Sequence, residues 1–147
     1  MNLYLDCEFN GHGGELISLA LADERGAASD HWYGVWPLPE NVHPWVAENV
    51  IPKLGMVPCQ PGLCRLALRE YIKHRSGDGR LTIWADWPDD FAHLMRVMSG
   101  PSYDESWMVD CTMKLITTPP GEPKPETPHN ALSDAIALMR WHQSLVQ

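Results

Sequence analysis

The sequence contains no long hydrophobic run and comparatively few basic residues. A membrane-spanning helix needs about 18 or more consecutive apolar residues, and no stretch approaches that length. The N-terminus also lacks a basic segment followed by an apolar one, so we expect neither a membrane span nor a signal peptide. Lys and Arg number 11 against 19 Asp and Glu, which gives a formal net charge of −8. This balance argues against a broad basic surface for long nucleic acid, but it allows an enzyme that acts on a short single-stranded end.

Cysteine is also sparse, with residues only at Cys7, Cys59, Cys64 and Cys111. They form no Cys-x-x-Cys pair, and none lies in a His-rich pattern typical of zinc sites. This usage favours reduced thiols in a cytoplasmic protein. Cys59 and Cys64 are nevertheless close enough in sequence for a disulfide, so that alternative stays open.

The composition is that of one globular domain over residues 1–147, with 44% hydrophobic and 20% charged residues. Apolar and aromatic runs predict strands, while helical spacing and proline at a first turn predict helices. One strand is expected within the first ten residues, and others cover 16–22, 31–36 and 81–84. A turn is expected at 76–80 and one further short strand within 107–113. The expected helices cover 44–51, 63–74, 88–98 and 131–145. A proline-rich segment, 119–128, is expected to be a stiff loop or lid.

The order of these elements predicts the kind of sheet. Three short strands with brief connections favour an antiparallel meander at the start of the chain. Later strands are separated by helices, which indicates that they join the sheet in parallel. The expected fold class is therefore α/β, a mixed sheet with helices on both faces.

The helix expected at 63–74 carries two kinds of side chain at helical spacing. Its expected apolar side consists of Leu63, Leu66, Ala67 and Tyr71. Another side carries the basic residues Arg65, Arg69 and Lys73. That basic stripe fits either contacts with phosphates or an ordinary solvated helix face, and the sequence leaves both open.

Two carboxylates interrupt the apolar opening strand. Asp6 and Glu8 are two residues apart, so both side chains project to the same face of a strand. Two adjacent carboxylates repel each other, and burying them without a partner is costly. A bound divalent cation relieves both problems, whereas an exposed edge strand would simply leave the two groups in water.

Further acids and one histidine stand where other elements end or begin. Asp86, Asp89 and Asp90 follow the strand at 81–84, and Asp134 lies on the last expected helix, five residues after His129. Carboxylate oxygens suit Mg²⁺ or Mn²⁺ rather than zinc. Two such ions stabilise the attacking and leaving oxygens of a phosphodiester displacement, and a neutral His takes a proton from water. The alternative for each acid is a solvated position or a helix cap.

At this point the sequence resembles a known family. Asp6-x-Glu8, an Asp in the middle motif, and His129-x-x-x-x-Asp134 are similar to the three motifs of the DEDDh 3′–5′ exonuclease superfamily. The resemblance is closest to the ribonuclease T-like branch typified by ribonuclease AS. The matching segments occur in the family's order and cover residues 6–9, 15–18, 50–54, 81–85 and 129–135.

The resemblance implies a ribonuclease H-like fold and two bound Mg²⁺ or Mn²⁺ ions. Asp6, Glu8 and Asp134 would hold the first ion, Asp6 would also reach the second, and His129 would be the general base. The family's middle motif is Asn-x-x-x-Asp, which here reads Asp86-Trp-Pro-Asp-Asp90. Alignment on the following apolar residues favours Asp90 as the catalytic, metal-binding acid, with Asp86 in place of Asn. The choice among Asp86, Asp89 and Asp90 stays open.

The resemblance also implies the reaction, which is hydrolysis from a 3′ end to nucleoside 5′-monophosphates. Phe9, Glu15 and Asp86 are the residues assigned to substrate binding, with Phe9 placed against the terminal base or sugar. Trp84 and Trp87 flank the middle motif, where Trp more often belongs to a core or an interface. Single-stranded RNA ranks above single-stranded DNA as substrate, and a homodimer is expected. A module that binds nucleic acid without turnover is the alternative from a different class.

Overall fold

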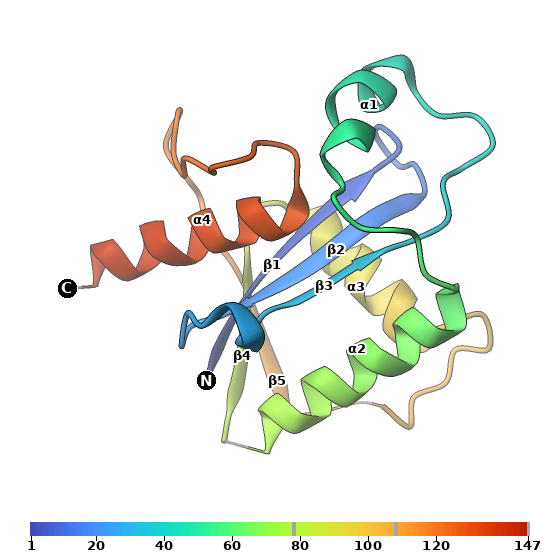
Figure 1. Ribbon diagram of the computed structural model, residues 1–147. Helices are drawn as coiled ribbons and strands as arrows, with labels where there is room; N and C mark the ends of the chain where they lie inside the picture. Colours follow the sequence, from blue (N-terminus) through green and yellow to red (C-terminus); the bar gives the residue numbers. More distant parts are fainter. Residues whose placement is uncertain (78, 108, 147) are drawn as a thin grey trace.

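The computed structural model describes residues 1–77, 79–107 and 109–146, and its centre is a mixed five-stranded sheet (Figure 1). The strand order is β3-β2-β1-β4-β5. β1 pairs antiparallel with β2, and β2 with β3, whereas β4 runs parallel to both β1 and β5. The expected antiparallel meander with parallel additions is therefore confirmed. The strands are β1 (Asn2–Phe9), β2 (Leu16–Asp23), β3 (Trp32–Val35), β4 (Leu81–Ala85) and β5 (Cys111–Leu115).

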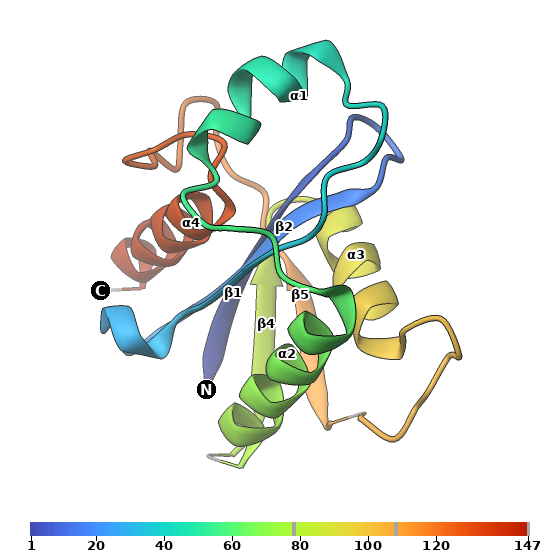
Figure 2. The same ribbon diagram turned by 45° about the vertical axis from the view of Figure 1, so that its right-hand side comes forward.

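Helices cover both faces of this sheet, as Figures 1 and 2 show. α2 and α3 pack on one face and α4 on the other, while α1 and a short 3-10 helix lie over the ends of β2 and β3. The α/β class with helices on both faces is confirmed. The helices are α1 (Pro44–Asn49), α2 (Pro61–Ser76), α3 (Pro88–Ser99) and α4 (Ala131–Leu145), with 3-10 turns η1 (Ala28–Asp30) and η2 (Ile51–Lys53).

The central strand β1 divides its side chains between the two layers. Leu3 and Leu5 are fully buried in the core that contains α2 and α3, whereas Tyr4 belongs to the core beneath α4. Alternation along the strand therefore directs Asp6 and Glu8 to the same side as Tyr4. These carboxylates lie at the C-terminal end of β1, beside the first turn of α4.

The apolar side of α2 differs from the one that the sequence predicted. Its buried residues are Cys64, Leu68, Ile72 and Arg75. Leu63 and Leu66, which were expected to be buried, are 61% and 57% exposed. The prediction was out of phase by about one position, because leucines occur on two sides of this helix and spacing alone does not choose between them.

The basic residues of α2 also have a structural use. Arg69 donates hydrogen bonds to the Met98 carbonyl oxygen and, at 3.0 Å, to the Asp104 carboxylate. Arg65 lies against the backbone of Gly100. Both arginines thus join α2 to the end of α3. The phosphate-binding stripe proposed from the sequence is not needed to explain them.

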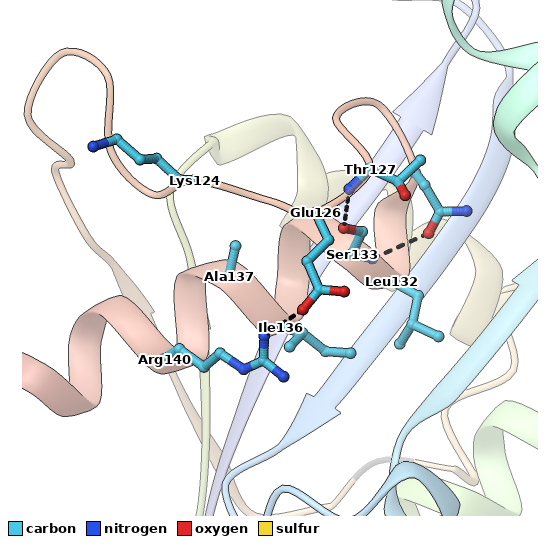
Figure 3. A pocket seen from close by; sticks show the side chains of 9 residues that line it. Lys124, Glu126, Thr127, Leu132, Ser133, Ile136, Ala137 and Arg140 are labelled. Carbon is cyan, nitrogen blue, oxygen red and sulfur yellow. Dashed lines mark hydrogen bonds and ion pairs between the residues drawn. The ribbon is translucent and has the colours of Figure 1, made fainter.

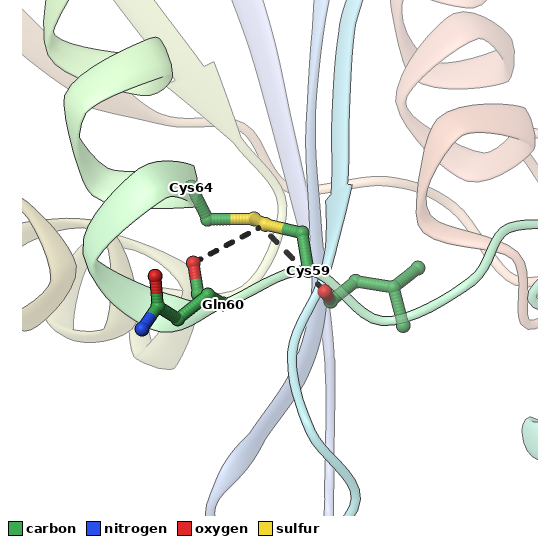
Figure 4. Close-up of a disulfide and its surroundings, with 4 residues drawn as sticks. Cys59, Gln60 and Cys64 are labelled. Carbon is green, nitrogen blue, oxygen red and sulfur yellow. Dashed lines mark hydrogen bonds between the residues drawn. A yellow bond between two sulfur atoms is a disulfide. The ribbon is translucent and has the colours of Figure 1, made fainter.

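Cys59 and Cys64 form a disulfide that ties the start of α2 to the preceding segment (Figure 4). The expectation that all four thiols are reduced is therefore wrong for this pair, while Cys7 and Cys111 are free. No helix among the described residues is long and apolar enough to cross a membrane. The turn expected at 76–80 and the strand expected at 107–113 include Asp78 and Met108, which lie outside the described residues.

Candidate metal centre

Carboxylates from β1, α3, α4 and the residue that follows β4 meet at the C-terminal end of β1. Each of two groups places one oxygen per residue within 4.8 Å of the others. The first group is Asp6, Glu8 and Asp134, and the second is Asp6, Asp86 and Asp90. Asp6 belongs to both groups. The structure therefore brings together every acid that the sequence offered as a metal ligand except Asp89, which is in neither group.

The backbone around β1 explains how two adjacent acids are accommodated. Asp6 lies opposite Ala20 of β2, and Glu8 lies opposite Ser18. Ala20 and Ser18 are small and fully buried, so they leave room on this face for α4. The register shifts after Glu8, and this β-bulge ends the regular pairing beside the site.

The start of α3 supplies the middle acid. Trp87 is the N-cap residue and makes no side-chain capping hydrogen bond, while Pro88 occupies the first turn. Asp90 follows in that turn and is only 1% exposed, with its Oδ2 atom buried and without a hydrogen-bond partner among the described residues. Asp90 is therefore neither a helix cap nor a solvated acid. Asp90 lies in the second carboxylate group together with Asp86, so the geometry leaves both as candidates for the middle acid.

The start of α4 supplies Asp134 and holds His129 beside it. Asn130 caps the helix, because its side-chain oxygen accepts a hydrogen bond from the Ser133 N–H at 3.0 Å. His129 has a φ of 65°, which is uncommon for a residue other than glycine and is typical of functional sites. Its backbone N–H donates a hydrogen bond of 2.9 Å to Oδ2 of Asp134. The left-handed backbone thus links the histidine directly to a carboxylate of the first group.

Burial raises the pKa of every carboxyl group in the cluster. For Glu8 the pKa rises to about 8, through burial, the charge of Asp134 and a hydrogen bond between the two carboxyls. Asp90 also reaches a pKa of about 8, through burial and then the charge of Asp86, and burial raises the pKa of Asp86 itself. The pKa of Asp134 rises to about 6, chiefly through burial. Burial and the charges of the neighbouring acids raise that of Asp6 well above its ordinary value.

This donor set fits divalent cations. The ligand atoms are all carboxylate oxygens, and the buried Oδ2 atoms of Asp6 and Asp90 have no hydrogen-bond partner among the described residues. Hard oxygen ligands of this kind match Mg²⁺ or Mn²⁺. A cation in each group would favour the ionised acids, which burial and mutual repulsion otherwise disfavour.

Residues near α1 hold the His129 segment, and the sequence did not single them out. The ring of Trp45 meets the His129 ring edge-on, with 4.9 Å between centroids. Lys53 donates a hydrogen bond of 2.9 Å to the Pro128 carbonyl oxygen, and its own carbonyl accepts one from Asn130 at 2.8 Å. Burial and the charge of Lys53 lower the pKa of His129, which keeps the imidazole neutral near pH 7. Lys53 lies in the family-like segment 50–54, whereas no sequence signal marks Trp45.

A pocket of about 470 Å³ adjoins the cluster through Glu8. Phe9 lines it and stacks on His93, with ring centroids 4.8 Å apart. Trp87 also lines it and is 54% exposed, so it belongs neither to the core nor to a described interface. Glu15 is exposed at the hairpin and is not among the lining residues. The residues that line this pocket are Cys7, Glu8, Phe9, Gly11, His12, His43, Trp45, Val46 and Trp87.

A second pocket, of about 230 Å³, lies between the 119–128 segment and α4 (Figure 3). Arg140 and Lys124 line it, but Arg140 is paired with Glu126 at 2.9 Å. Lys124 is paired with Glu122 at 3.1 Å. The positive charges of Lys124 and Arg140 are thus both neutralised by ion pairs, and none of the clustered acids lines this pocket.

No protein-family model, curated protein or solved structure matches the chain. Any functional assignment therefore depends on the geometry and chemistry of the cluster and of the pocket beside it.

Proposed function

We propose that this protein is a metal-dependent 3′–5′ exonuclease that hydrolyses single-stranded nucleic acid to nucleoside 5′-monophosphates. One observation carries the proposal: two three-carboxylate groups share Asp6, and His129 stands beside one of them. Sites with two divalent cations a few ångströms apart are typical of phosphodiester hydrolysis. The family resemblance of the motifs and the mixed sheet further support a ribonuclease H-like fold of the DEDDh type.

In this proposal Asp6, Glu8 and Asp134 hold the first cation, and Asp6 and Asp90 contribute to the second. The cations supply charge stabilisation of the attacking and leaving oxygens when they are bound. His129 is neutral near pH 7 and accepts the proton of the attacking water. Its backbone hydrogen bond to Asp134 holds the residue beside the first group, and its ring packs edge-on against Trp45.

The pocket that contains Phe9 is the proposed site for the terminal nucleoside. It is apolar and aromatic on several sides and opens beside Glu8, so a base in it would leave its phosphate near the carboxylates. Aromatic stacking tolerates any base, which suits an enzyme that removes successive nucleotides. We propose single-stranded RNA as the first substrate, from the resemblance, and single-stranded DNA as the second.

The 119–128 segment is the proposed lid. It leads directly into His129, and in this conformation the Pro128 carbonyl oxygen accepts a hydrogen bond from Lys53. Movement of the segment would carry His129 toward or away from the cluster, so closure over the substrate would control proton transfer. If replacing several of its prolines leaves turnover unchanged, this role is wrong.

Two further parts of the proposal concern assembly and location. The exposed Leu63 and Leu66 of α2 offer apolar surface for the homodimer that the resemblance implies, and light scattering in solution tests it. The free thiols Cys7 and Cys111 suit a cytoplasmic location, whereas the Cys59–Cys64 disulfide suits an oxidising compartment. Trapping thiols with an alkylating reagent at cell lysis distinguishes the two: a cytoplasmic protein would carry Cys59 and Cys64 reduced.

The decisive experiment is incubation of 5′-labelled oligoribonucleotide and oligodeoxyribonucleotide with the protein in Mg²⁺ or Mn²⁺. We expect stepwise shortening from the 3′ end, release of 5′-monophosphates, and loss of both in Asp6→Ala and His129→Ala. Asp89→Ala is the matched control, because Asp89 is in neither carboxylate group, and it should remain active. Binding without degradation of either polymer, across several metals, would instead support a non-catalytic binding module.

A further inference from the structure

Asp86 occupies a position that the substrate-binding assignment does not explain. It is the first residue after β4, and its carboxylate lies within 4.8 Å of ligand atoms of both Asp6 and Asp90. It is not among the residues that line the Phe9 pocket. Its nearest chemical neighbours in the cluster are therefore other acids.

The second group contains buried oxygens that lack a partner. Asp90 is 1% exposed, and its Oδ2 atom makes no hydrogen bond within the described chain; the same is true of the buried Oδ2 of Asp6. A buried carboxylate without a hydrogen bond or counter-ion is costly. The charges that act most strongly on Asp6 and Asp90 come from other acids. Lys53, by contrast, acts on Glu8 and Asp134 of the first group.

We propose that Asp86 is a direct ligand of the second cation and completes a three-carboxylate site with Asp6 and Asp90. This inference rests on the two-cation centre of the proposed function, but not on turnover. It also has a consequence for the order of binding. A site with three protein carboxylates holds its cation before nucleic acid arrives, whereas a site with two depends more on the substrate phosphate.

The residue type at position 86 decides whether the second site has three protein carboxylates or two. The related motif has Asn there, and an amide is neutral and offers one acceptor oxygen. Asp offers two oxygens and a negative charge at the same place. The extra charge increases the attraction for a divalent cation, and it increases repulsion among the acids when no cation is bound.

The test is a titration of Mn²⁺ into the metal-free protein in the absence of nucleic acid. Electron paramagnetic resonance and calorimetry measure the binding. We expect two Mn²⁺ ions per wild-type chain and a spin-coupled signal, because the two ions would share Asp6. Asp86→Asn should still bind the first ion, but its affinity for the second ion should fall by at least about tenfold and the spin-coupled signal should be lost. Asp89→Asn is the matched control and should bind two ions as the wild type does.

Two results would overturn the inference: a wild-type chain that binds one Mn²⁺, or an Asp86→Asn variant that still binds two with unchanged affinity. Asp90→Asn provides a second variant with the same expected loss, in case one substitution prevents folding. Because no nucleic acid is present, the result is independent of the exonuclease assay. A chain that binds two ions but degrades nothing would refute the proposed function and leave this inference standing.

Discussion

The backbone N–H of His129 donates a hydrogen bond of 2.9 Å to the Oδ2 atom of Asp134. One carboxylate is thus available to a cation and also fixes the backbone of the proposed general base. The bond is formed with His129 in the left-handed conformation, with φ at 65°, so an uncommon local backbone occurs at the chemical site. The first prediction separates these two functions.

His129→Ala should lower kcat by about 10²- to 10⁴-fold, the usual contribution of general base catalysis, and leave Mn²⁺ binding unchanged. Asp134→Asn should lower kcat and also lower the affinity for the first cation, because it removes a carboxylate ligand. Single-turnover rates and Mn²⁺ titrations of both variants check this. Equal loss of metal binding in the two variants would contradict the separation.

The stability of the metal-free protein should fall as the pH rises through the range in which the cluster ionises. The pKa of Glu8 is raised from 4.5 to about 8 and that of Asp90 from 3.8 to about 8. The folded chain therefore binds more protons than the unfolded chain between those values, so the free energy of unfolding decreases with pH.

We expect the melting temperature of the metal-free protein to fall by roughly 5–10 °C between pH 5 and pH 8.5. Saturating Mg²⁺ should remove most of that fall, because cations replace the protons. The Glu8→Gln/Asp90→Asn double variant is the control and should show a flatter profile without metal. Calorimetry over this pH range measures all three, and a flat wild-type profile would refute the coupling.

Lys53→Ala should lower kcat by about tenfold, because it removes the hydrogen bond to the Pro128 carbonyl that precedes His129. Lys53→Arg retains a donor and a positive charge and should recover most of the activity. Lys114→Ala removes an exposed lysine that lies over the Trp84 ring, and it serves as the control for loss of charge. An effect on KM alone would show that Lys53 contacts substrate instead of holding the segment.

Phe9→Ala should raise KM between about 5-fold and 100-fold, the range expected for one lost base–aromatic stacking contact. Steady-state kinetics on a short oligoribonucleotide provide the measurement. Tyr103→Ala is the matched control, since Tyr103 is a highly exposed aromatic residue that does not line the Phe9 pocket. Unchanged KM in Phe9→Ala would remove Phe9 from the proposed nucleoside site.

The two sides of α2 should respond differently to truncation. Leu68→Ala should reduce the free energy of unfolding by about 2–5 kcal/mol, because Leu68 is fully buried. Leu66→Ala, at an exposed position on the same helix, should change the free energy of unfolding of the monomer by less than about 0.5 kcal/mol. Chemical denaturation measures both, and similar losses would indicate that Leu66 is covered in solution.

Much of the fold follows from local sequence signals. Alternation in β1 directs Asp6 and Glu8 to one face, and proline at the first turn marks the start of α3. The side of α2 that packs was not predictable, because leucine occurs on two sides and only the tertiary contacts of Leu68 distinguish them. The Cys59–Cys64 disulfide was left open because proximity in sequence does not determine pairing.

The candidate site also contains residues that the sequence predicted and residues that it did not. The acids and His129 were accessible from the sequence because each stands at the end of a predicted element. Trp45 was not, since its contact with His129 joins residues far apart in the chain and no local pattern encodes it. Asp86 was noticed as one of three candidates for the middle acid, but its closeness to Asp6 was not predictable, because that distance depends on the pairing of β4 with β1 in the folded sheet.

The first carboxylate group joins residues near position 6 to a residue at position 134, and this has a consequence during synthesis. Domains fold as the ribosome releases them, and β1 emerges long before α4. Until α4 has been made and has docked on β1 and β2, Asp134 and His129 are both missing from the centre. Under the proposed function, a nascent chain would therefore remain inactive beside the messenger that encodes it.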